Sequence, residues 1–282
     1  MIIDVKNIVK QYKTTKAVDD VTFSVKEGEI FGFLGPNGAG KSTIIKILTS
    51  RLSLTSGSVM VAGFNPLKER EQLHNIIGVI PEIQNLYERM SARENLTLFA
   101  KLYKAKLSKV DDLLKRFELD ERADDKLKNF SFGMKQRILI ARGLLADPKI
   151  IFMDEPTKGL DPHTARYIRE IIKEENQKGV TIFLTTHYME EAEMLSDRVA
   201  ILDKGKIVAL DSPQNLKRKG KNSLILKLKN NENMEISLDD EADREKMQKL
   251  TIENQILSVE SKEESLEDVF VKLTGRKLVW IN

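Results

Sequence analysis

The octapeptide GPNGAGKS at residues 35–42 constrains this chain more than any other part of its sequence. It satisfies the pattern G-x-x-x-x-G-K-[ST] and lies between an apolar run, IFGFL, and a stretch with helical spacing, STIIKIL. Gly35, Gly38 and Gly40 allow the backbone to curl so that several N–H groups converge on phosphate oxygens. The sequence therefore predicts a strand, a phosphate-binding loop and a helix whose N-terminus faces the bound anion.

The side chains of this loop have separate expected roles. Lys41 is expected to reach the β- and γ-phosphates of ATP, and Ser42 to offer its hydroxyl to Mg²⁺. The other loop residues are expected to contact the nucleotide mainly through the backbone: Gly35, Pro36, Asn37, Gly38, Ala39, Gly40 and Thr43. An incidental glycine-rich turn would not combine all the fixed positions with these flanks. We therefore expect ATP and Mg²⁺ as ligands.

Two apolar runs further along the chain end in residues suited to the same site. Residues 150–153 are followed by Asp154 and Glu155, and residues 180–184 lead into His187. Since helical patterns flank both runs, we expect central parallel strands that are covered on both faces. The carboxyl ends of such strands meet at the edge of the sheet where ligands bind.

These polar residues have different expected roles in hydrolysis. Asp154 is expected to hold Mg²⁺ through water, and Glu155 to orient or deprotonate the attacking water. A neutral His187 is expected to hydrogen-bond the γ-phosphate and that water. An acidic turn or a lone histidine is more often structural, but the phosphate loop upstream favours the catalytic roles.

Composition limits the classes of partner. The 282 residues are 41% apolar and 32% charged, and 46 basic against 43 acidic residues leave a net charge of +3. This balance does not favour a nucleic acid partner. The chain has no cysteine, which fits a reducing compartment. Neither a signal peptide nor a run of eighteen apolar residues occurs, so we expect any work at a membrane to need a spanning partner.

The pattern of elements changes along the chain. Short strands are predicted at residues 2–9, 17–25, 30–34, 58–62 and 76–80. Between about 91 and 146, apolar residues recur at three- and four-residue intervals, which predicts helices. A break at Ser212-Pro213 and the basic stretch KRKGK at 217–221 predict a hinge.

A smaller α+β unit is predicted beyond the hinge. Residues 224–228, 234–238 and 256–259 have the apolar alternation of strands. The segment SLEDVFVKLTG follows them with helical spacing, and Ser265 is placed to cap this helix and Gly275 to end it.

The motifs together resemble those of the nucleotide-binding subunit of an ABC transporter. GPNGAGKS, NFSFGMKQR, IIFMDEPTKGLD and TTHYMEEAEMLSDRVAILDKGKI occur in the order typical of that family. The resemblance implies an α/β fold. Its P-loop NTPase core has a parallel sheet, an N-terminal antiparallel β subdomain and an inserted helical subdomain at about 85–146. We therefore expect an ABC ATPase domain at 1–214 and a C-terminal α+β accessory domain at 215–282.

Two further segments narrow the resemblance. PEIQNLYERMSARENL and SLEDVFVKLTGRKL resemble single-domain subunits that power exporters of drugs, lipids, polysaccharides or ions. This implies ATP hydrolysis coupled to transport, a separate membrane-spanning permease, a cytoplasmic position on the inner face of the cell membrane, and no nucleic acid partner. The transported substrate stays open, as does the choice between a homodimer and a heterodimer.

Two other functions are compatible with a nucleotide-binding domain of this kind. A soluble ABC ATPase that acts on nucleic acid or ribosomes is the alternative. Such relatives usually carry two nucleotide domains or a long coiled coil, and this sequence has neither. A non-hydrolysing regulatory subunit is disfavoured because Lys41, Asp154, Glu155 and His187 are all present.

The resemblance also assigns residues that spacing alone does not. Ser131, Gly133 and Met134 occupy the signature loop, which in a head-to-tail dimer would face the γ-phosphate bound by the second subunit. Ser131 is also placed to cap the helix that follows. Tyr12 occupies the position of an aromatic residue that stacks on adenine. Asp161 lies in the loop that contacts the partner subunit.

Two positions depart from the family pattern. Phe132 replaces the first glycine of the usual signature. The residue after Pro81 is Glu82, where the family usually has a glutamine that binds Mg²⁺, and Gln84 follows two residues later. A carboxylate is also a hard oxygen ligand, although it adds negative charge beside a triphosphate. We favour Glu82 for this role and keep Gln84 as the alternative, and we expect Lys158 to face solvent.

Overall fold

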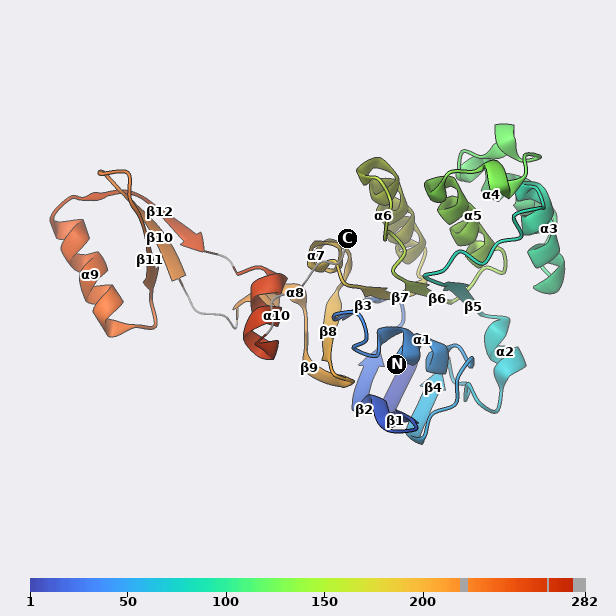
Figure 1. Ribbon diagram of the computed structural model, residues 1–282, viewed down its shortest axis with the longest axis horizontal. Helices are drawn as coiled ribbons and strands as arrows, with labels where there is room; N and C mark the ends of the chain where they lie inside the picture. Colours follow the sequence, from blue (N-terminus) through green and yellow to red (C-terminus); the bar gives the residue numbers. More distant parts are fainter. Residues whose placement is uncertain (219–222, 263, 276–282) are drawn as a thin grey trace. The chain divides into compact units, whose positions relative to one another are not determined.

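The computed structural model describes residues 1–218, 223–262 and 264–275 (Figure 1). The chain divides into two compact units, Met1–Ala209 and Leu210–Asn282. The larger unit contains two sheets and the phosphate-loop sequence, and the smaller unit contains one sheet.

The division lies within strand β9 (Lys206–Asp211), ahead of the expected boundary at 214/215. Pro213 begins the short helix α8 (Pro213–Arg218) and is therefore not part of a linker. Proline is tolerated in the first turn of a helix because its missing N–H has no helical partner there. Most of the predicted hinge KRKGK, residues 219–221, lies outside the described residues.

The larger unit is built on a six-stranded sheet with the order β5-β6-β7-β3-β8-β9. Besides β9, its strands are β3 (Ile30–Leu34), β5 (Ile77–Ile80), β6 (Ile150–Asp154), β7 (Thr181–Thr186) and β8 (Arg198–Asp203). The strands from β5 to β8 pair in parallel. Every residue of β3, β6 and β7 is buried, which confirms that the apolar runs form central strands.

The register of this sheet brings separate loops together. Asp154 at the end of β6 pairs with Thr185 of β7, and Leu34 at the end of β3 pairs with Thr186. Because these strands run parallel, the segments that follow them emerge at the same edge of the sheet. The phosphate loop, Glu155 and His187 therefore start from neighbouring strand ends.

A second sheet packs near the first through helix α1. This antiparallel sheet has the order β2-β1-β4, with β1 (Ile3–Tyr12), β2 (Thr15–Val25) and β4 (Ser56–Val61). Helix α1 (Lys41–Leu48) contacts β2 and β4 of this sheet and β6 of the parallel sheet (Figure 1). The family-based expectation of an N-terminal antiparallel subdomain is therefore confirmed.

The inserted segment is helical, as predicted. Its helices are α3 (Ala92–Leu102), α4 (Ser108–Arg116) and α5 (Phe132–Leu144), with short 3₁₀ turns at Asp120–Arg122 and Leu127–Asn129. One apolar cluster includes Leu96 of α3, Ile138 of α5, and Ile151 and Leu184 of the parallel sheet. The segment therefore shares its core with the sheet.

Three further helices complete the larger unit. They are α2 (Arg70–His74), α6 (Pro162–Gln177) and α7 (Met189–Leu195). In Figure 1, α6 and α5 lie on the same side of the parallel sheet, opposite the antiparallel sheet. The short helices α2 and α7 and the strands β8 and β9 were not among the predicted elements.

The smaller unit has an antiparallel sheet with the order β11-β10-β12. Its elements are β10 (Ser223–Leu228), β11 (Asn233–Ser237), α9 (Glu241–Ile252), β12 (Ile256–Lys262), α10 (Leu266–Thr274) and α8. Helix α9 was not predicted, because none of its residues is fully buried and its apolar periodicity is weak. Ser265 caps α10 and Gly275 ends it at φ 68°, both as predicted.

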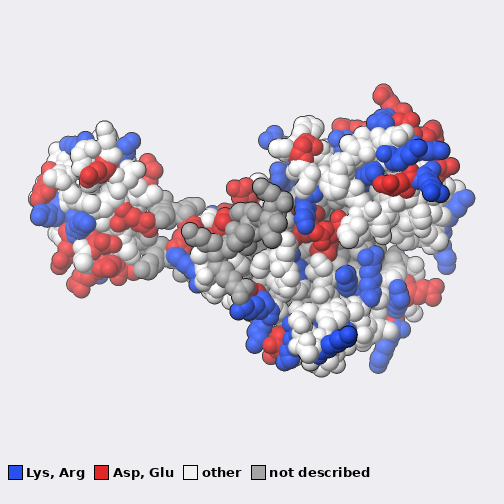
Figure 2. Space-filling view, in the orientation of Figure 1, with Lys and Arg blue, Asp and Glu red and all other residues white. Residues whose placement is uncertain are grey.

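The surface of the described chain carries both signs of charge. On the face shown in Figure 2, Lys and Arg side chains are interspersed with Asp and Glu over the larger unit. Across the described ranges, no helix is both long enough and apolar enough to cross a bilayer.

Candidate functional site

The phosphate-loop sequence borders a cleft of about 310 Å³. The residues that line the cleft are Ala17, Pro36, Asn37, Gly38, Gly40, Lys41, Ser42, Thr43, Glu82, Glu155 and Lys158. Gly40 has φ 112°, and a Cβ atom there would lie 2.4 Å from the carbonyl oxygen of Ala17. Gly38 has φ 81°, so its backbone conformation also favours glycine. Gly35 and Ala39 belong to the loop but do not line the cleft.

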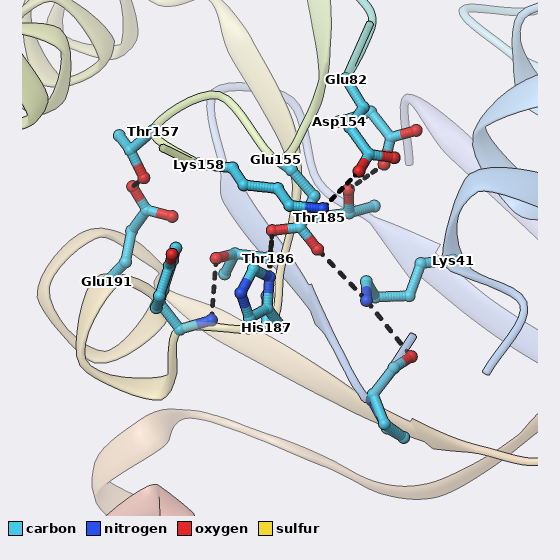
Figure 3. Close-up of polar contacts among 12 residues, drawn as sticks. Lys41, Glu82, Asp154, Glu155, Thr157, Lys158, Thr185, Thr186, His187 and Glu191 are labelled. Atoms are coloured by element: carbon cyan, nitrogen blue, oxygen red, sulfur yellow. Dashed lines mark hydrogen bonds and ion pairs between the residues drawn. The ribbon is translucent and has the colours of Figure 1, made fainter. Parts of the chain in front are cut away.

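Lys41 joins the loop to the end of strand β6. Its ammonium donates a hydrogen bond to the carbonyl oxygen of Gly35 at 2.7 Å and lies 3.2 Å from Oε1 of Glu155 (Figure 3). The side chains of Lys41 and Glu155 are 5% and 4% exposed, so this is a buried ion pair. The predicted phosphate ligand and the predicted base are therefore in direct contact.

Glu155 also contacts His187. Its Oε2 lies 2.7 Å from Nδ1 of His187 and accepts from the backbone N–H of His187 at 3.2 Å. Burial raises the pKa of Glu155, but the hydrogen bond with His187 and the charge of Lys41 outweigh burial, so this pKa is below its usual value. The structure thus brings together the three residues predicted to be catalytic, with Glu155 as an ionised carboxylate at neutral pH.

The backbone holds Glu155 in an unusual conformation. Glu155 has φ 54°, in the left-handed region that non-glycine residues rarely occupy. Its N–H donates to the carbonyl oxygen of Thr185 at 3.0 Å, which continues the contact between β6 and β7 by one residue. Strained backbone of this kind is concentrated at functional sites, where the surroundings keep it in place.

Asp154 lies beside Glu155 and is 7% exposed. The hydroxyl of Thr185 donates to Oδ1 of Asp154 at 2.5 Å. Burial raises the pKa of Asp154, and the charges of Glu82 and Glu155 add to this effect, whereas hydrogen bonds from Thr185 and Ser42 oppose it. A divalent cation at this position would relieve the repulsion among the three carboxylates.

The donor set suits Mg²⁺ that arrives with a nucleotide. Ser42 and Glu82 line the cleft, and Asp154 hydrogen-bonds Ser42. Among the described residues, no group of three or more His, Cys, Asp or Glu side chains is placed to hold a metal alone. Mg²⁺ is usually held by one or two carboxylates together with phosphate oxygens. The residues present therefore fit a metal whose remaining ligands come from the substrate and water.

Glu82 and Gln84 face different parts of the molecule. Glu82 lines the cleft, where its Oε1 accepts from the ammonium of Lys158 at 2.7 Å. Lys158, expected to face solvent, is 40% exposed but makes this ion pair (Figure 3). Gln84 instead donates to the carbonyl oxygen of Phe132 at 3.0 Å and to Oε1 of Gln136 at 2.9 Å.

Gln136 extends this contact to the loop after β6. The side chain is 4% exposed, and its Nε2 donates to the carbonyl oxygen of Pro156 at 2.9 Å. The segment after β5, helix α5 and the residue after Glu155 are thus joined by consecutive hydrogen bonds. Sequence patterns did not indicate this connection.

The signature residues lie at the N-terminus of α5, and none of them lines the cleft. Ser131 caps the helix as predicted, because its hydroxyl accepts from the N–H of Met134 at 3.2 Å. The adjacent Phe132 is 51% exposed. Gly133 faces α6, since a Cβ atom there would lie 3.1 Å from the side chain of Thr164.

Two other predicted contact residues are also outside the cleft lining. Tyr12, at the end of β1, is 44% exposed, and the ammonium of Lys10 lies 5.2 Å from its ring centroid. Asp161 caps α6, because its Oδ1 accepts from the N–H of Thr164 at 3.0 Å.

A buried polar pair adjoins the site and was missed from the sequence. The hydroxyl of Thr157 donates to Oε1 of Glu191 at 2.6 Å, and both residues are buried. Burial raises the pKa of Glu191, although the hydrogen bond from Thr157 opposes the shift. Glu191 lies on α7, a helix too short for its apolar periodicity to predict which side chains are buried.

Comparison with known proteins identifies the family of the fold that carries this site. Residues 18–158 match the family model described as ABC transporter. The chain is 40% identical over 267 residues to the fluoroquinolones export ATP-binding protein of Mycobacterium tuberculosis (strain CDC 1551 / Oshkosh), covering 93% of this chain and 89% of that protein. It is 34% identical to the bacitracin transport ATP-binding protein BcrA of Bacillus licheniformis, covering 97% of each.

Solved structures show the same fold. One, described as an ATP-binding subunit of an ABC transporter, superposes with a TM-score of 0.72 at 32% identity, covering 78% of this chain and 93% of that one. Another is a dimeric ATP-binding cassette in a post-hydrolysis state bound to ADP and Pi. It superposes with a TM-score of 0.68 at 28% identity and covers 74% and 98%.

Proposed function

The chain belongs to the ABC transporter family of ATP-binding proteins, and on this premise we propose that it is the ATP-hydrolysing subunit that powers a membrane exporter. The observation that carries the enzymatic part is the contact of Glu155 with both Lys41 and His187 beside the phosphate loop. This constellation places a cation and a base in the lining of one cleft, with a proton donor hydrogen-bonded to the base.

Each residue has a role that its contacts allow. Lys41 and the loop N–H groups bind the phosphates, and Tyr12 contributes an aromatic face for adenine. Ser42, Asp154 and Glu82 hold Mg²⁺, which supplies positive charge at the phosphate oxygens. Glu155 orients or deprotonates the attacking water, and His187 holds the Glu155 carboxylate in position through its Nδ1–H.

Turnover in this proposal requires a second subunit. Ser131, Gly133 and Met134 lie at a helix N-terminus, outside the lining of this chain's own cleft. Exposed N–H groups at such a terminus suit an anion, so these residues would complete the cleft of a partner in a head-to-tail dimer. A cassette of similar fold is described as a dimer with ADP and Pi.

The exporter assignment is supported by the relatives named for export or transport of antibiotics. It calls for a membrane-spanning permease as partner and a peripheral position at the inner face of the cell membrane. The proposal extends to drug, lipid, polysaccharide or ion efflux as classes of transport. A nucleic acid partner is not part of it.

Fractionation of cells that express the tagged chain tests this function. We expect the chain to sediment with membranes and to co-purify, in detergent, with a multispanning protein whose presence stimulates ATP hydrolysis. K41A, which removes the phosphate-binding ammonium, should keep the association and lose nucleotide binding. Sedimentation with ribosomes and no membrane partner would instead favour a soluble ABC ATPase.

A further inference from the structure

The ion pair between Glu82 and Lys158 is a feature of the cleft that hydrolysis by Lys41, Glu155 and His187 does not explain. The Lys158 ammonium lies 2.7 Å from Oε1 of Glu82, and the two side chains are 40% and 39% exposed. Both residues line the cleft that contains Lys41. The cleft therefore has one buried ammonium and a second that is open to solvent.

Lys158 is placed close to the reacting end of the site. Its N–H donates to the carbonyl oxygen of Glu155 at 3.2 Å, and Gly159 follows with φ 72°. This turn ties the backbone of Lys158 to the predicted base. The side chain, in contrast, is held by a solvent-exposed ion pair with Glu82, and such pairs contribute little to stability.

The charges of the cleft explain why a second cation is useful. Lys41 is already paired with Glu155, and Asp154 lies beside them as a further acidic group. Glu82 therefore adds a carboxylate where a polyanion is expected. The positive charge of Lys158 balances the negative charge of Glu82. A glutamine at position 82 would carry no charge and would need no such partner.

We propose that Lys158 is a phosphate-binding residue that is kept from phosphate by its ion pair with Glu82 until a metal ion binds. When Glu82 engages a metal ion, the Lys158 ammonium is released next to Glu155 and binds the terminal phosphate. A hard divalent cation is a better partner for carboxylate oxygens than an ammonium, and an ammonium is a compact charge with three donors for phosphate. This inference rests on the proposed function, because it takes the ligand to be a nucleoside triphosphate.

Binding of ATP without metal tests the proposal, because E82Q should release Lys158 just as a metal would. The probe is ATP in the presence of EDTA, measured by calorimetry with E82Q, K158M and the double variant. With Lys158 present, E82Q should tighten ATP binding about tenfold, the effect of one charged hydrogen bond near solvent. In the K158M background, E82Q should tighten it only about twofold, through the loss of one solvent-screened negative charge in the cleft.

ADP and a second lysine provide the controls. The excess gain is the tightening by E82Q beyond that seen in the K158M background. It should be absent with ADP, which lacks the terminal phosphate. It should persist in E82Q/K158R, because arginine keeps a cation at this position. It should also persist in E82Q/K101M, because Lys101 is an exposed residue of α3 outside the cleft.

Two results would overturn the proposal. One is an equal gain from E82Q with and without K158M, which would mean that only net charge matters. The other is an equal excess for ADP and ATP. The proposed function fails in a different way: the chain would not bind ATP even with Mg²⁺, or K41A would bind it equally well.

Discussion

The imidazole Nδ1 of His187 lies 2.7 Å from Oε2 of Glu155, at the ends of two neighbouring parallel strands. Glu155 is ionised at neutral pH because its pKa is lowered by His187 and Lys41 despite burial. A carboxylate can only accept, so Nδ1 carries the hydrogen of this bond. His187 therefore fixes the orientation of the Glu155 carboxylate, and this carboxylate remains ionised and able to act as a base.

Replacing Glu155 by glutamine should separate binding from hydrolysis. E155Q keeps the shape of the side chain but removes its basicity, so kcat should fall by about 10²- to 10⁴-fold. ATP binding should remain, because Lys41 and the loop are unchanged. Phosphate release in a single turnover, together with ATP affinity, measures both effects. Wild-type turnover by E155Q would show that Glu155 is not the base.

The metal requirement should depend on Glu82 and not on Gln84. Glu82 lines the cleft, whereas Gln84 hydrogen-bonds Phe132 and Gln136. E82A should raise the Mg²⁺ concentration for half-maximal hydrolysis about tenfold or more, and EDTA should abolish hydrolysis in every variant. Q84A is the matched control and should leave that concentration unchanged. The opposite outcome for the two variants would assign the metal contact to Gln84.

Glu191 should make stability depend on pH. Its pKa is raised by burial above the ordinary value of 4.5, so the folded state binds more protons than the unfolded state between these two pKa values. The contribution of Glu191 to the free energy of unfolding therefore falls as pH rises through that window. E191Q keeps an acceptor for Thr157 and should flatten this dependence, making the protein equally or more stable at pH 7.

Chemical denaturation of wild type and E191Q from pH 4.5 to pH 8 measures the difference. E191A serves as the control, because it leaves the buried hydroxyl of Thr157 without its acceptor. It should lower the free energy of unfolding by about 1–3 kcal/mol. An E191Q profile parallel to wild type would show that Glu191 does not titrate in this range.

The buried Gln136 should stabilise the fold more than its half-buried neighbour Gln84. Q136A removes the amide that donates to the carbonyl oxygen of Pro156 and accepts from Gln84. The Pro156 carbonyl oxygen then loses this hydrogen bond. The free energy of unfolding should fall by about 1–3 kcal/mol. Q84A should cost less, because water can replace its bonds. Equal losses in a denaturant titration would contradict this order.

The strands of the core could be predicted from the sequence because burial on both faces leaves continuous apolar runs. The residues at which these strands end were less predictable. The run at 150–153 continues as strand through Asp154, and the run at 180–184 continues through Thr185 and Thr186, since polar residues also pair in the ladder. Helix α9 was missed because a polar helix on a small sheet leaves little periodicity.

The site was predictable only in part for a related reason. Lys41, Glu155 and His187 each follow an apolar run, so parallel strands bring them to one edge. The partners of Glu82 and Gln84, in contrast, depend on the directions that their side chains take in an irregular segment after β5. No spacing in the sequence encodes those directions.

A second subunit should contribute its Ser131 to hydrolysis. If Ser131 completes the cleft of a partner, a negative charge there should block hydrolysis without weakening ATP binding by the separate chain. S131D suits this test because aspartate caps a helix as well as serine does, so the cap on Met134 is kept. Hydrolysis should fall about 10²-fold, by repulsion of the developing charge on the γ-phosphate.

S265D is the matched control, since Ser265 caps α10 in the smaller unit. It should leave hydrolysis unchanged. Specific activity of the wild type should also fall on dilution, because a site shared by two chains is lost when they separate, while ATP binding through Lys41 should persist. Activity strictly proportional to protein concentration down to high dilution, together with full activity of S131D, would mean that one chain suffices for turnover.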